Sequence, residues 1–461
     1  MKWVALLFCL PVCLAAMSLQ EAEQMALANN TEVKAAEELL EMARQGRMET
    51  ISRWLPKLTI NSQGYAIQKN IPLLKLNKHS AFMTQLNLTQ TLFSSELFHQ
   101  IKYSSLMVDQ FSKLLEAARN DVLFQTRALY YLIALDIKKL KTAQENIDLL
   151  QFLTDRMEKR REIGESTIYH VNQARVATAN ISDTYFMAEK NLRNHRDQMV
   201  QLLGFLPSET TFELSQEELD VEQFAMLKDK VEKAQEVFEE GSIIKSTFVE
   251  LEKKIMTKLF SEGEFHKWNL MAEDFRPDLQ LSRTRMQLAK ENVRIKKSEY
   301  WPTISLLGNY GGAPTPYFFQ PSTDFTNQQF NWGFGFSLNW TIFDGTGRSR
   351  RIKKAQAEAR AVAQNAKHST QTAETEVRDQ LYQMEEALAK YLSSSSNFKL
   401  AKETLEQAKS QLEIGYITIY DYLISVDGHI RAKTAHDEGK YGLLASYFGL
   451  LHATGKESAH E

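Results

Sequence analysis

The chain has 461 residues, a formal net charge of -3 and a pI of about 6.4, so no global positive field would draw it to nucleic acid. It contains only 19 glycines and 9 prolines, and the stretches 73–206 and 322–461 have no proline. This shortage disfavours a disordered chain, a collagen-like repeat and a turn-rich all-β protein, and it predicts long uninterrupted elements.

The first sixteen residues have the pattern of a secretory signal peptide. A single lysine precedes an apolar run from Trp3 to Leu14, and Ala15-Ala16 offers small residues for cleavage. A buried N-terminal helix is the alternative, and lipidation of Cys13 is another, although Leu10-Pro11-Val12 is a poor match to the usual pattern before a lipidated cysteine. Cys9 and Cys13 are the only cysteines, so cleavage would leave a chain without disulfides or cysteine-bound metal. No later run of eighteen apolar residues predicts a membrane-spanning helix.

The remainder of the chain contains one structural plan twice. Four matches between the halves keep the same order, with offsets of 246, 250, 251 and 251 residues. The clearest is Glu162-Ile163-Gly164-x-x-Thr167-Ile168-Tyr169, which recurs as Glu413-Ile414-Gly415-x-x-Thr418-Ile419-Tyr420. We therefore expect a first repeat over 17–206, an insert over 207–270, a second repeat over 271–455 and a polar tail over 456–461.

Each repeat is expected to contain a helix, two strands, a very long helix, a sharp turn and a return helix. The first repeat predicts these elements at about 18–53, 58–68, 81–93, 94–163 and 166–204. The second predicts them at about 275–300, 303–311, 329–343, from the Asp344–Thr346 caps to Ile414, and 417–454. A long helix of about 70 residues would measure roughly 105 Å, and such a thin bundle predicts oligomerisation.

The last predicted strand alternates without exception between large apolar and small polar residues. Its apolar face is Phe330, Trp332, Phe334, Phe336, Leu338, Trp340 and Ile342. A soluble amphipathic strand is the alternative, but the length of the strand and its small polar opposite face favour contact with lipid. Because four strands cannot close a barrel, several copies would have to share one. Eight strands from a dimer would be filled by side chains, whereas twelve from a trimer begin to leave a lumen.

At this point the sequence resembles the TolC-like outer-membrane efflux proteins. The resemblance rests on Ser18-Leu19-x-x-Ala22 after the signal, Leu55-Pro56 and Trp301-Pro302 before strands, Thr341-Ile342-Phe343-Asp344-Gly345 after one, and the two Gly-x-x-Thr turns. It implies a mainly α fold: a long antiparallel α-helical barrel with four β-strands per protomer, joined as a homotrimer with a shared 12-stranded β-barrel in the outer membrane. It further implies a passive exit duct for drug efflux or type I secretion that docks a periplasmic adaptor and an inner-membrane pump.

The resemblance also assigns roles to the turn residues. Gly164, Thr167, Gly415 and Thr418 would form the adaptor-docking tip at the periplasmic end. Asp421 matches an acid of the family's entrance constriction, where three copies would favour cations. The other constriction positions hold Ile424, Ile417 and His170, so most of the family's salt-bridge lock is missing. Asp421 as a solvated acid of a first helical turn, and His170 as an ordinary surface histidine, are the alternatives.

No enzymatic motif, cofactor site or metal-ligand pattern occurs in the sequence. We therefore expect a protein without catalytic activity, and the substrate cannot be read from these residues. The rival from another class is a secreted or surface-bound trimeric coiled-coil stalk or adhesin. The duplicated strand pairs discriminate between them, because a stalk needs no strands with a lipid-facing side.

Overall fold

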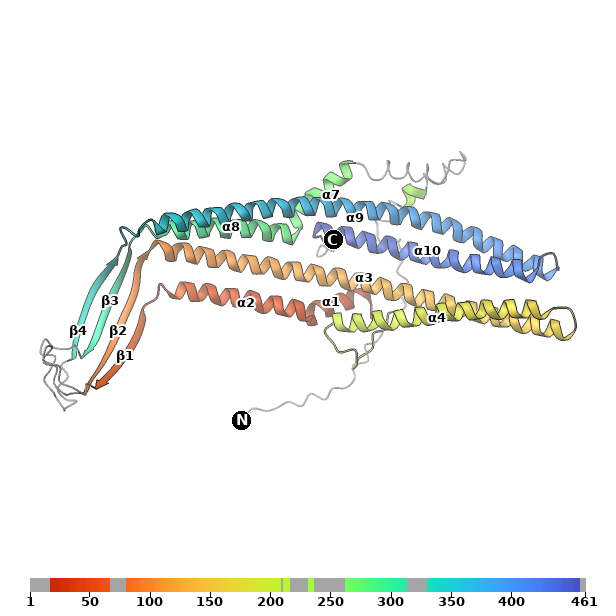
Figure 1. Cartoon of the computed structure of the whole chain (residues 1–461), viewed down its shortest axis with the longest axis horizontal. Coiled ribbons are helices and arrows are strands. Elements are labelled where there is room, and N and C mark those ends of the chain that lie inside the picture. Colours follow the sequence, from red (N-terminus) through yellow and green to blue (C-terminus); the bar gives the residue numbers. More distant parts are fainter. Residues whose placement is uncertain are drawn as a thin grey trace. The chain divides into compact units, whose positions relative to one another are not determined.

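The computed structural model describes residues 17–66, 80–208, 210–215, 231–235, 262–312 and 330–456. The predicted signal peptide, most of the insert and the tail beyond Lys456 lie outside the described residues. Within them, helices and strands follow the duplicated order (Figure 1). The first repeat contains α1 (Leu19–Asn29), α2 (Thr31–Ser52), β1 (Lys57–Ala66), β2 (Ser80–Ser94), α3 (Ser95–Glu162) and α4 (Ile168–Leu202). The second contains α7 (Glu262–Phe275), α8 (Pro277–Ser298), β3 (Thr303–Gly312), β4 (Phe330–Asn339), α9 (Gly347–Glu413) and α10 (Ile419–Thr454).

The chain divides into two compact units. The strand unit comprises residues 37–114 and 281–368, and the turn unit comprises residues 1–36, 115–280 and 369–461. The strand unit holds the whole sheet, and the turn unit holds α4, α10 and both glycine turns. No helix in the described part of the chain is both long enough and apolar enough to cross a membrane.

The sheet of the strand unit has four antiparallel strands in the order β1-β2-β3-β4 (Figure 1). Its register places the apolar positions of all four strands on one face, because Ile60 pairs with Leu86, Leu86 with Tyr310, and Tyr310 with Trp332. The large side chains of this face are exposed, with 74% of Trp332 accessible. Exposed members of the predicted set on β4 are Trp332, Phe334, Phe336 and Leu338. The side chain of Phe330 lies outside the described residues.

The predicted strand over 329–343 is too long at its C-terminal end. β4 ends at Asn339, so Trp340 and Ile342 lie in the connection to α9 and are not strand residues. The Trp340 indole Nε1 donates a hydrogen bond to the carbonyl oxygen of Tyr300 at 3.1 Å, which holds the end of β4 beside the start of β3. Gly345 and Thr346 then adopt left-handed φ angles of 66° and 76°, which turn the chain into α9. The alternation of apolar and polar residues does not show where the strand ends, because Trp340 and Ile342 continue the apolar positions and are also exposed.

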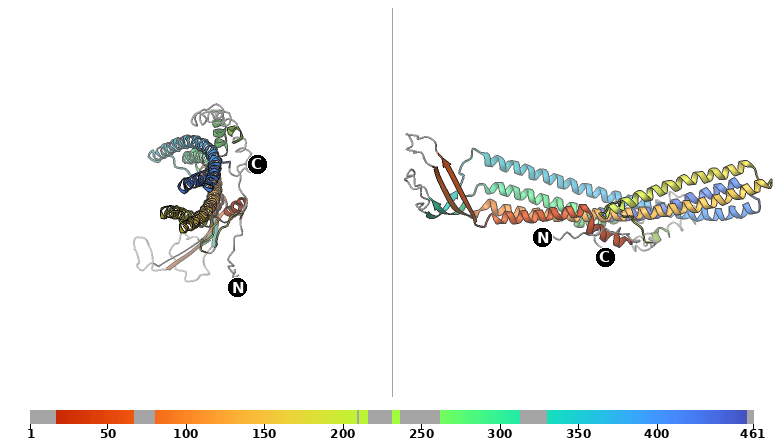
Figure 2. Two further views of the ribbon diagram at one scale, coloured as in Figure 1. Left: turned by 90° about the vertical axis from the view of Figure 1, so that its right-hand side faces the viewer. Right: turned by 90° about the horizontal axis from the view of Figure 1, so that it is seen from below.

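In the turn unit, α4 returns beside the last part of α3, and α10 returns beside the last part of α9 (Figures 1 and 2). One apolar cluster joins all four helices near the turns through Leu150 of α3, Val171 of α4, Ala408 of α9 and Tyr422 of α10. A second cluster packs Trp268 and other apolar residues of α7 against α9 and α10.

The helices before the strands are interrupted, which corrects the predicted continuous helix over 18–53. The predicted helix over 18–53 breaks at Asn30, where the side-chain Oδ1 accepts hydrogen bonds from the backbone N–H groups of Glu32 and Val33 and begins α2. The second repeat breaks at the equivalent position, Arg276, before the proline that begins α8. The predicted boundary between insert and second repeat at residue 270 therefore falls inside α7, which is the counterpart of α1.

Each return helix ends against one of these breaks. Gly204 and Gly455 follow α4 and α10 with φ angles of 82° and 72°. Asn30 Nδ2 donates to the carbonyl oxygen of Leu202 at 2.9 Å, and Arg276 Nη1 donates to that of Ala453 at 3.3 Å. The two repeats thus close the same junction with different side chains.

Candidate functional site at the two glycine turns

The turns after α3 and α9 have the same backbone geometry. Gly164 and Gly415 have φ angles of 83° and 75°, a region that favours glycine. In each turn the glycine N–H bonds three residues back and the next N–H bonds five residues back: Glu165 to Arg160 at 2.8 Å and Tyr416 to Gln411 at 2.8 Å. These bonds form the Schellman closure that satisfies the last carbonyl groups of a helix. Both glycines are exposed, and a Cβ atom at either would meet no atom within 4 Å.

The two return helices begin differently although both follow a threonine. Thr418 and Asp421 form a capping box: the Asp421 backbone N–H donates to Thr418 Oγ1 at 3.3 Å, and the Thr418 backbone N–H donates to Asp421 Oδ2 at 3.1 Å. Thr167 makes no such side-chain bond at the start of α4. The residue three positions on is His170, which has no carboxylate that could complete a capping box.

The Asp421 carboxylate is exposed and ionised at neutral pH. Hydrogen bonds from the Thr418 side chain and backbone lower its pKa below the ordinary aspartate value. Its position at the first turn of α10 also suits the positive end of the helix dipole. This local role is the one that the structure displays for Asp421, and its predicted place in a constriction ring stays a prediction.

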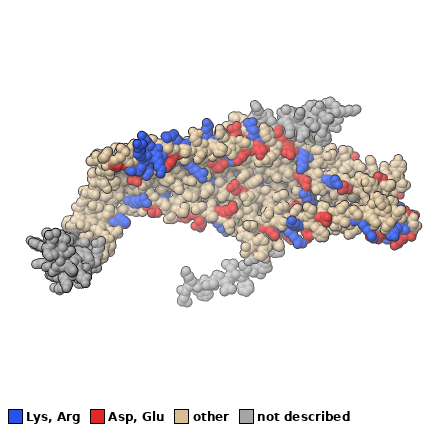
Figure 3. All heavy atoms as spheres, in the orientation of Figure 1, with Lys and Arg blue, Asp and Glu red and all other residues tan. Residues whose placement is uncertain are grey.

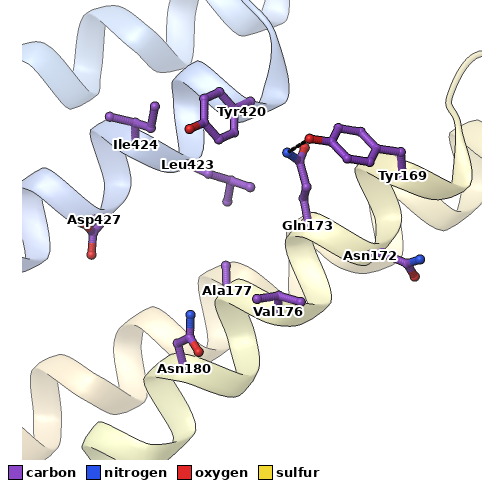
Figure 4. A pocket seen from close by; sticks show the side chains of 10 residues that line it. All are labelled: Tyr169, Asn172, Gln173, Val176, Ala177, Asn180, Tyr420, Leu423, Ile424 and Asp427. Atoms are coloured by element: carbon purple, nitrogen blue, oxygen red, sulfur yellow. Dashed lines mark hydrogen bonds between the residues drawn. The ribbon is translucent and has the colours of Figure 1, made fainter.

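A cleft of about 460 Å³ lies between the first turns of α4 and α10 (Figure 4). It is lined from α4 by Tyr169, Asn172, Gln173, Val176, Ala177 and Asn180, and from α10 by Tyr420, Leu423, Ile424 and Asp427. Val176 and Ile424 present apolar side chains that are 60% and 53% exposed. The Gln173 side-chain Nε2 donates to the Tyr169 hydroxyl at 3.0 Å, as the dashed line in Figure 4 shows. The cleft therefore combines apolar side chains with amides, phenols and one carboxylate, a mixture suited to binding a protein segment.

The predicted site residues are only partly brought together in this cleft. Ile424 lines it, whereas Asp421, His170 and Ile417 do not. Ile417 packs against the four-helix apolar cluster, so its side chain supports the turn. His170 is half-buried, with its Nδ1 3.5 Å from the Ser166 hydroxyl oxygen.

Most of the cleft residues were missed by sequence reasoning. A signal existed for two of them, because Tyr169 and Tyr420 are the tyrosines of the repeated Gly-x-x-Thr-Ile-Tyr motif. The remaining positions differ between the repeats: Gln173 in α4 corresponds to Ile424 in α10 at the same offset of 251 residues. Duplication alone therefore could not identify them.

The described residues contain no group of three or more His, Cys, Asp or Glu side chains arranged to hold a metal ion. The ionic contacts near the turns are pairs on the surface, such as Arg175 with Glu158 at 2.6 Å.

Comparisons with known proteins agree over almost the whole chain. The family described as outer membrane efflux protein matches residues 22–205 and 271–425. The outer membrane protein TolC of Escherichia coli is 20% identical over 451 residues, which cover 95% of this chain and 82% of TolC. The crystal structure of CusC has a TM-score of 0.75 at 17% identity and covers 96% of this chain and 93% of its own. That of the Campylobacter jejuni CmeC outer membrane channel has a TM-score of 0.72 at 18% identity, with coverage of 95% and 86%.

The family match falls in two segments that leave out the predicted insert over 207–270, and its second segment ends at residue 425. The mainly α fold with a small antiparallel sheet is the fold of these channels. The chain therefore belongs to the outer membrane efflux protein family and is an outer-membrane channel protein.

Proposed function

We propose that three copies of this chain form a passive exit duct for efflux, with no catalytic turnover. The observation that carries the proposal is the open sheet of the strand unit. Among the described residues β1 and β4 each pair with one neighbour only, and the apolar face of the sheet is exposed. An unpaired strand edge is not tolerated in hydrocarbon, so β4 of one copy would pair with β1 of the next.

The strand directions suit this closure. Neighbouring strands alternate in direction from β1 to β4, so β4 of one copy can lie antiparallel to β1 of another. Three sheets would give a twelve-stranded barrel, the smallest shared barrel here that leaves a lumen. The small polar face of β4, with Gly333, Gly335 and Ser337, would line it.

Disulfide trapping tests the trimer. We expect a cysteine at Thr59 in β1, combined with one at Gly333, Gly335 or Ser337 in β4, to give a ladder of cross-linked species that stops at three chains. No cysteine follows Cys13, so the background after signal removal should be low. The measurement is non-reducing denaturing electrophoresis after oxidation in membranes.

A pair at Thr59 and Asn309 is the control, because β2 lies between β1 and β3 and no cross-link between copies is expected. Cross-linking that stops at two chains, or a monomer that leaves the membrane without detergent, would contradict the trimeric duct. The alternative, a coiled-coil stalk, predicts that the protein can be extracted without detergent. The family match gives this alternative no support.

We further propose that the glycine turns and the cleft between α4 and α10 receive a periplasmic adaptor that recruits an inner-membrane pump. Support comes from the exposed apolar residues Val176 and Ile424 on a cleft that is also lined by amides, phenols, other apolar side chains and the carboxylate of Asp427. Burial of such side chains in a preformed cleft is typical of protein recognition. Type I secretion has no observation of its own in its favour, so efflux is the function proposed.

Separate measurements of export and conductance distinguish docking from conduction. We expect Ile424→Glu and Val176→Glu each to abolish export of a fluorescent efflux substrate by cells, because each would bury a charge in the docked cleft. Val176 is at none of the predicted constriction positions, so Val176→Glu should leave single-channel conductance unchanged. Ile424→Leu, which keeps the apolar surface, should export normally. Asp421→Asn should lower the preference for cations in a planar bilayer, because three carboxylates at one constriction attract cations.

Normal export by Ile424→Glu would contradict docking in the cleft. A cation preference that is unchanged in Asp421→Asn would remove this carboxylate from the conduction path and leave it as a helix cap.

A further inference from the structure

A basic cluster lies in the strand unit where the helices meet the sheet. Five of the eight residues from Gly347 to Lys354 at the start of α9 are Arg or Lys, and none is acidic. The end of α8 adds an exposed stripe of Lys290, Arg294 and Lys297 at helical spacing. Figure 3 shows Lys and Arg side chains gathered over this part of α8 and α9. We call these residues the basic shoulder.

Internal pairing accounts for only part of the basic shoulder. Arg351 bonds both Glu299 and Asp344, and buried Arg348 contacts Asp344 and stacks over Tyr300. By contrast, Arg350, Lys353 and Lys297 are exposed and have no ion pair with any residue that the structure describes. The paired cations Arg348 and Arg351 stabilise the local fold. The three exposed cations without an ion pair can bind an external anion.

Helix stability does not explain the available cations. Positive side chains in the first turn of a helix oppose the helix dipole, so Arg350 weakens the start of α9, and Lys353 one turn later does not stabilise it. The corresponding start of α3, Ser95 to Lys102, carries one acid and one lysine, so the fold does not require a basic shoulder at this place. An anion outside the chain would turn this unfavourable arrangement into a favourable one.

A belt of exposed aromatic residues adjoins the shoulder. Trp301 lies in the turn that follows α8, four residues after Lys297, and it is 64% exposed. Trp340 lies beside it through its bond to Tyr300. Tryptophan and tyrosine side chains with an apolar ring and a polar atom prefer the headgroup level of a bilayer. The belt is continuous with the exposed apolar face of β4 on one side and with the cations on the other.

We propose that the basic shoulder binds the headgroups of anionic phospholipids in the periplasmic leaflet of the outer membrane. The order along the surface is apolar sheet, aromatic belt and unpaired cations, which is the order of acyl chain, interface and headgroup in a lipid leaflet. The inference rests on the proposed barrel in one respect, that the apolar face of the sheet meets lipid. The helix side of the sheet then faces the periplasm, so phospholipid rather than lipopolysaccharide is the occupant.

Lipid exchange on the purified full-length protein tests the proposal. Protein in detergent is incubated with equal amounts of phosphatidylglycerol and phosphatidylethanolamine, and bound lipid is counted by native mass spectrometry. We expect wild type to bind phosphatidylglycerol preferentially, and R350Q/K353Q/K297Q to lose this preference about tenfold or more. The matched control R285Q/R360Q/K367Q removes three exposed cations of α8 and α9 farther from the sheet and should keep the preference.

Three outcomes would overturn the inference: equal loss in both variants, displacement of lipid by inorganic phosphate at the same concentration, or stronger binding of lipopolysaccharide. Thermal loss of helical circular dichroism shows that each variant is folded. Disulfide trapping shows whether a negative lipid-binding result contradicts the basic-shoulder proposal alone or the proposed trimeric barrel as well. If the trimer forms but the preference for phosphatidylglycerol is absent, only the lipid-binding proposal is wrong. If no trimer forms, the proposed shared barrel is wrong.

Discussion

Alanine at Gly204 or Gly455 should destabilise the turn unit far more than alanine at Gly164 or Gly415. All four glycines close a helix with left-handed φ angles of 72° to 83°, so each substitution costs about 1 kcal/mol in backbone strain. A Cβ atom at Gly204 would also lie 2.9 Å from the carbonyl carbon of Asn29, and one at Gly455 would lie 2.6 Å from the Cα atom of Arg276. Backbone atoms cannot move aside cheaply, and we expect a total cost of about 3 kcal/mol.

The two groups of glycines therefore serve as controls for each other. The measurement is the temperature at which the detergent-solubilised protein loses its helical circular dichroism signal. Equal decreases in this temperature for Gly204→Ala and Gly164→Ala would contradict the prediction. They would show that backbone strain accounts for the whole loss and that the Asn29 backbone moves away from the new Cβ atom at little cost. Export assays should also separate the groups, because Gly164 and Gly415 lie at the proposed docking surface and the other two do not.

Removal of either member of the Glu23–Arg127 pair should be the most destabilising change of a charged residue. Arg127 Nε donates to Glu23 Oε1 at 2.6 Å, and both side chains are buried. Arg127 also lies over the ring of Phe448 at 5.2 Å, which ties α3 to α10 in the turn unit. Glu23→Ala would leave a buried guanidinium without its carboxylate, at a cost of about 3–5 kcal/mol.

A double-mutant cycle tests the reason for this cost. Glu23→Leu with Arg127→Met replaces the pair by apolar side chains of similar length, and we expect it to recover most of the stability lost in either single variant. The exposed pair Arg431–Asp427, at 2.9 Å on one face of α10, provides the comparison. Its removal should change stability by less than about 1 kcal/mol. Additive losses at Glu23 and Arg127 would contradict a dominant role for charge burial.

The long elements were predictable because their signals are periodic or repeated. The glycines at 164 and 415 end both long helices within one residue of the predicted position, and the strand alternation locates the sheet. The start of α8 at Pro277 lies within two residues of the predicted position, 275. The break at Asn30 was not predicted, because one residue interrupts the helix while the apolar period continues into the next turn. The end of β4 was misjudged for the same reason: Trp340 keeps the alternation, but its indole bonds Tyr300 outside the strand.

The candidate site was less predictable than the fold. The sequence identifies the turns because glycine is needed there, but the cleft depends on which faces of α4 and α10 meet. Helical spacing predicts that Val176 and Ile424 lie on the surface of separate helices and does not show that they share one cleft. The proposed role of Asp421 in a constriction rests on family resemblance. Its capping bond to Thr418 instead follows from the local Thr-x-x-Asp spacing, which is typical of a capping box.

The unequal junctions at Asn30 and Arg276 give the two halves of this protein different chemical sensitivities. The Asn30 amide joins α4 by a neutral hydrogen bond, whereas Arg276 also holds the carboxylates of Asp278 and Glu376. Coulombic attraction at the partly exposed second junction is screened by dissolved ions, and a neutral amide bond is not. Added salt should therefore weaken the junction of the second repeat more than that of the first, so two junctions in equivalent places respond differently to ionic strength.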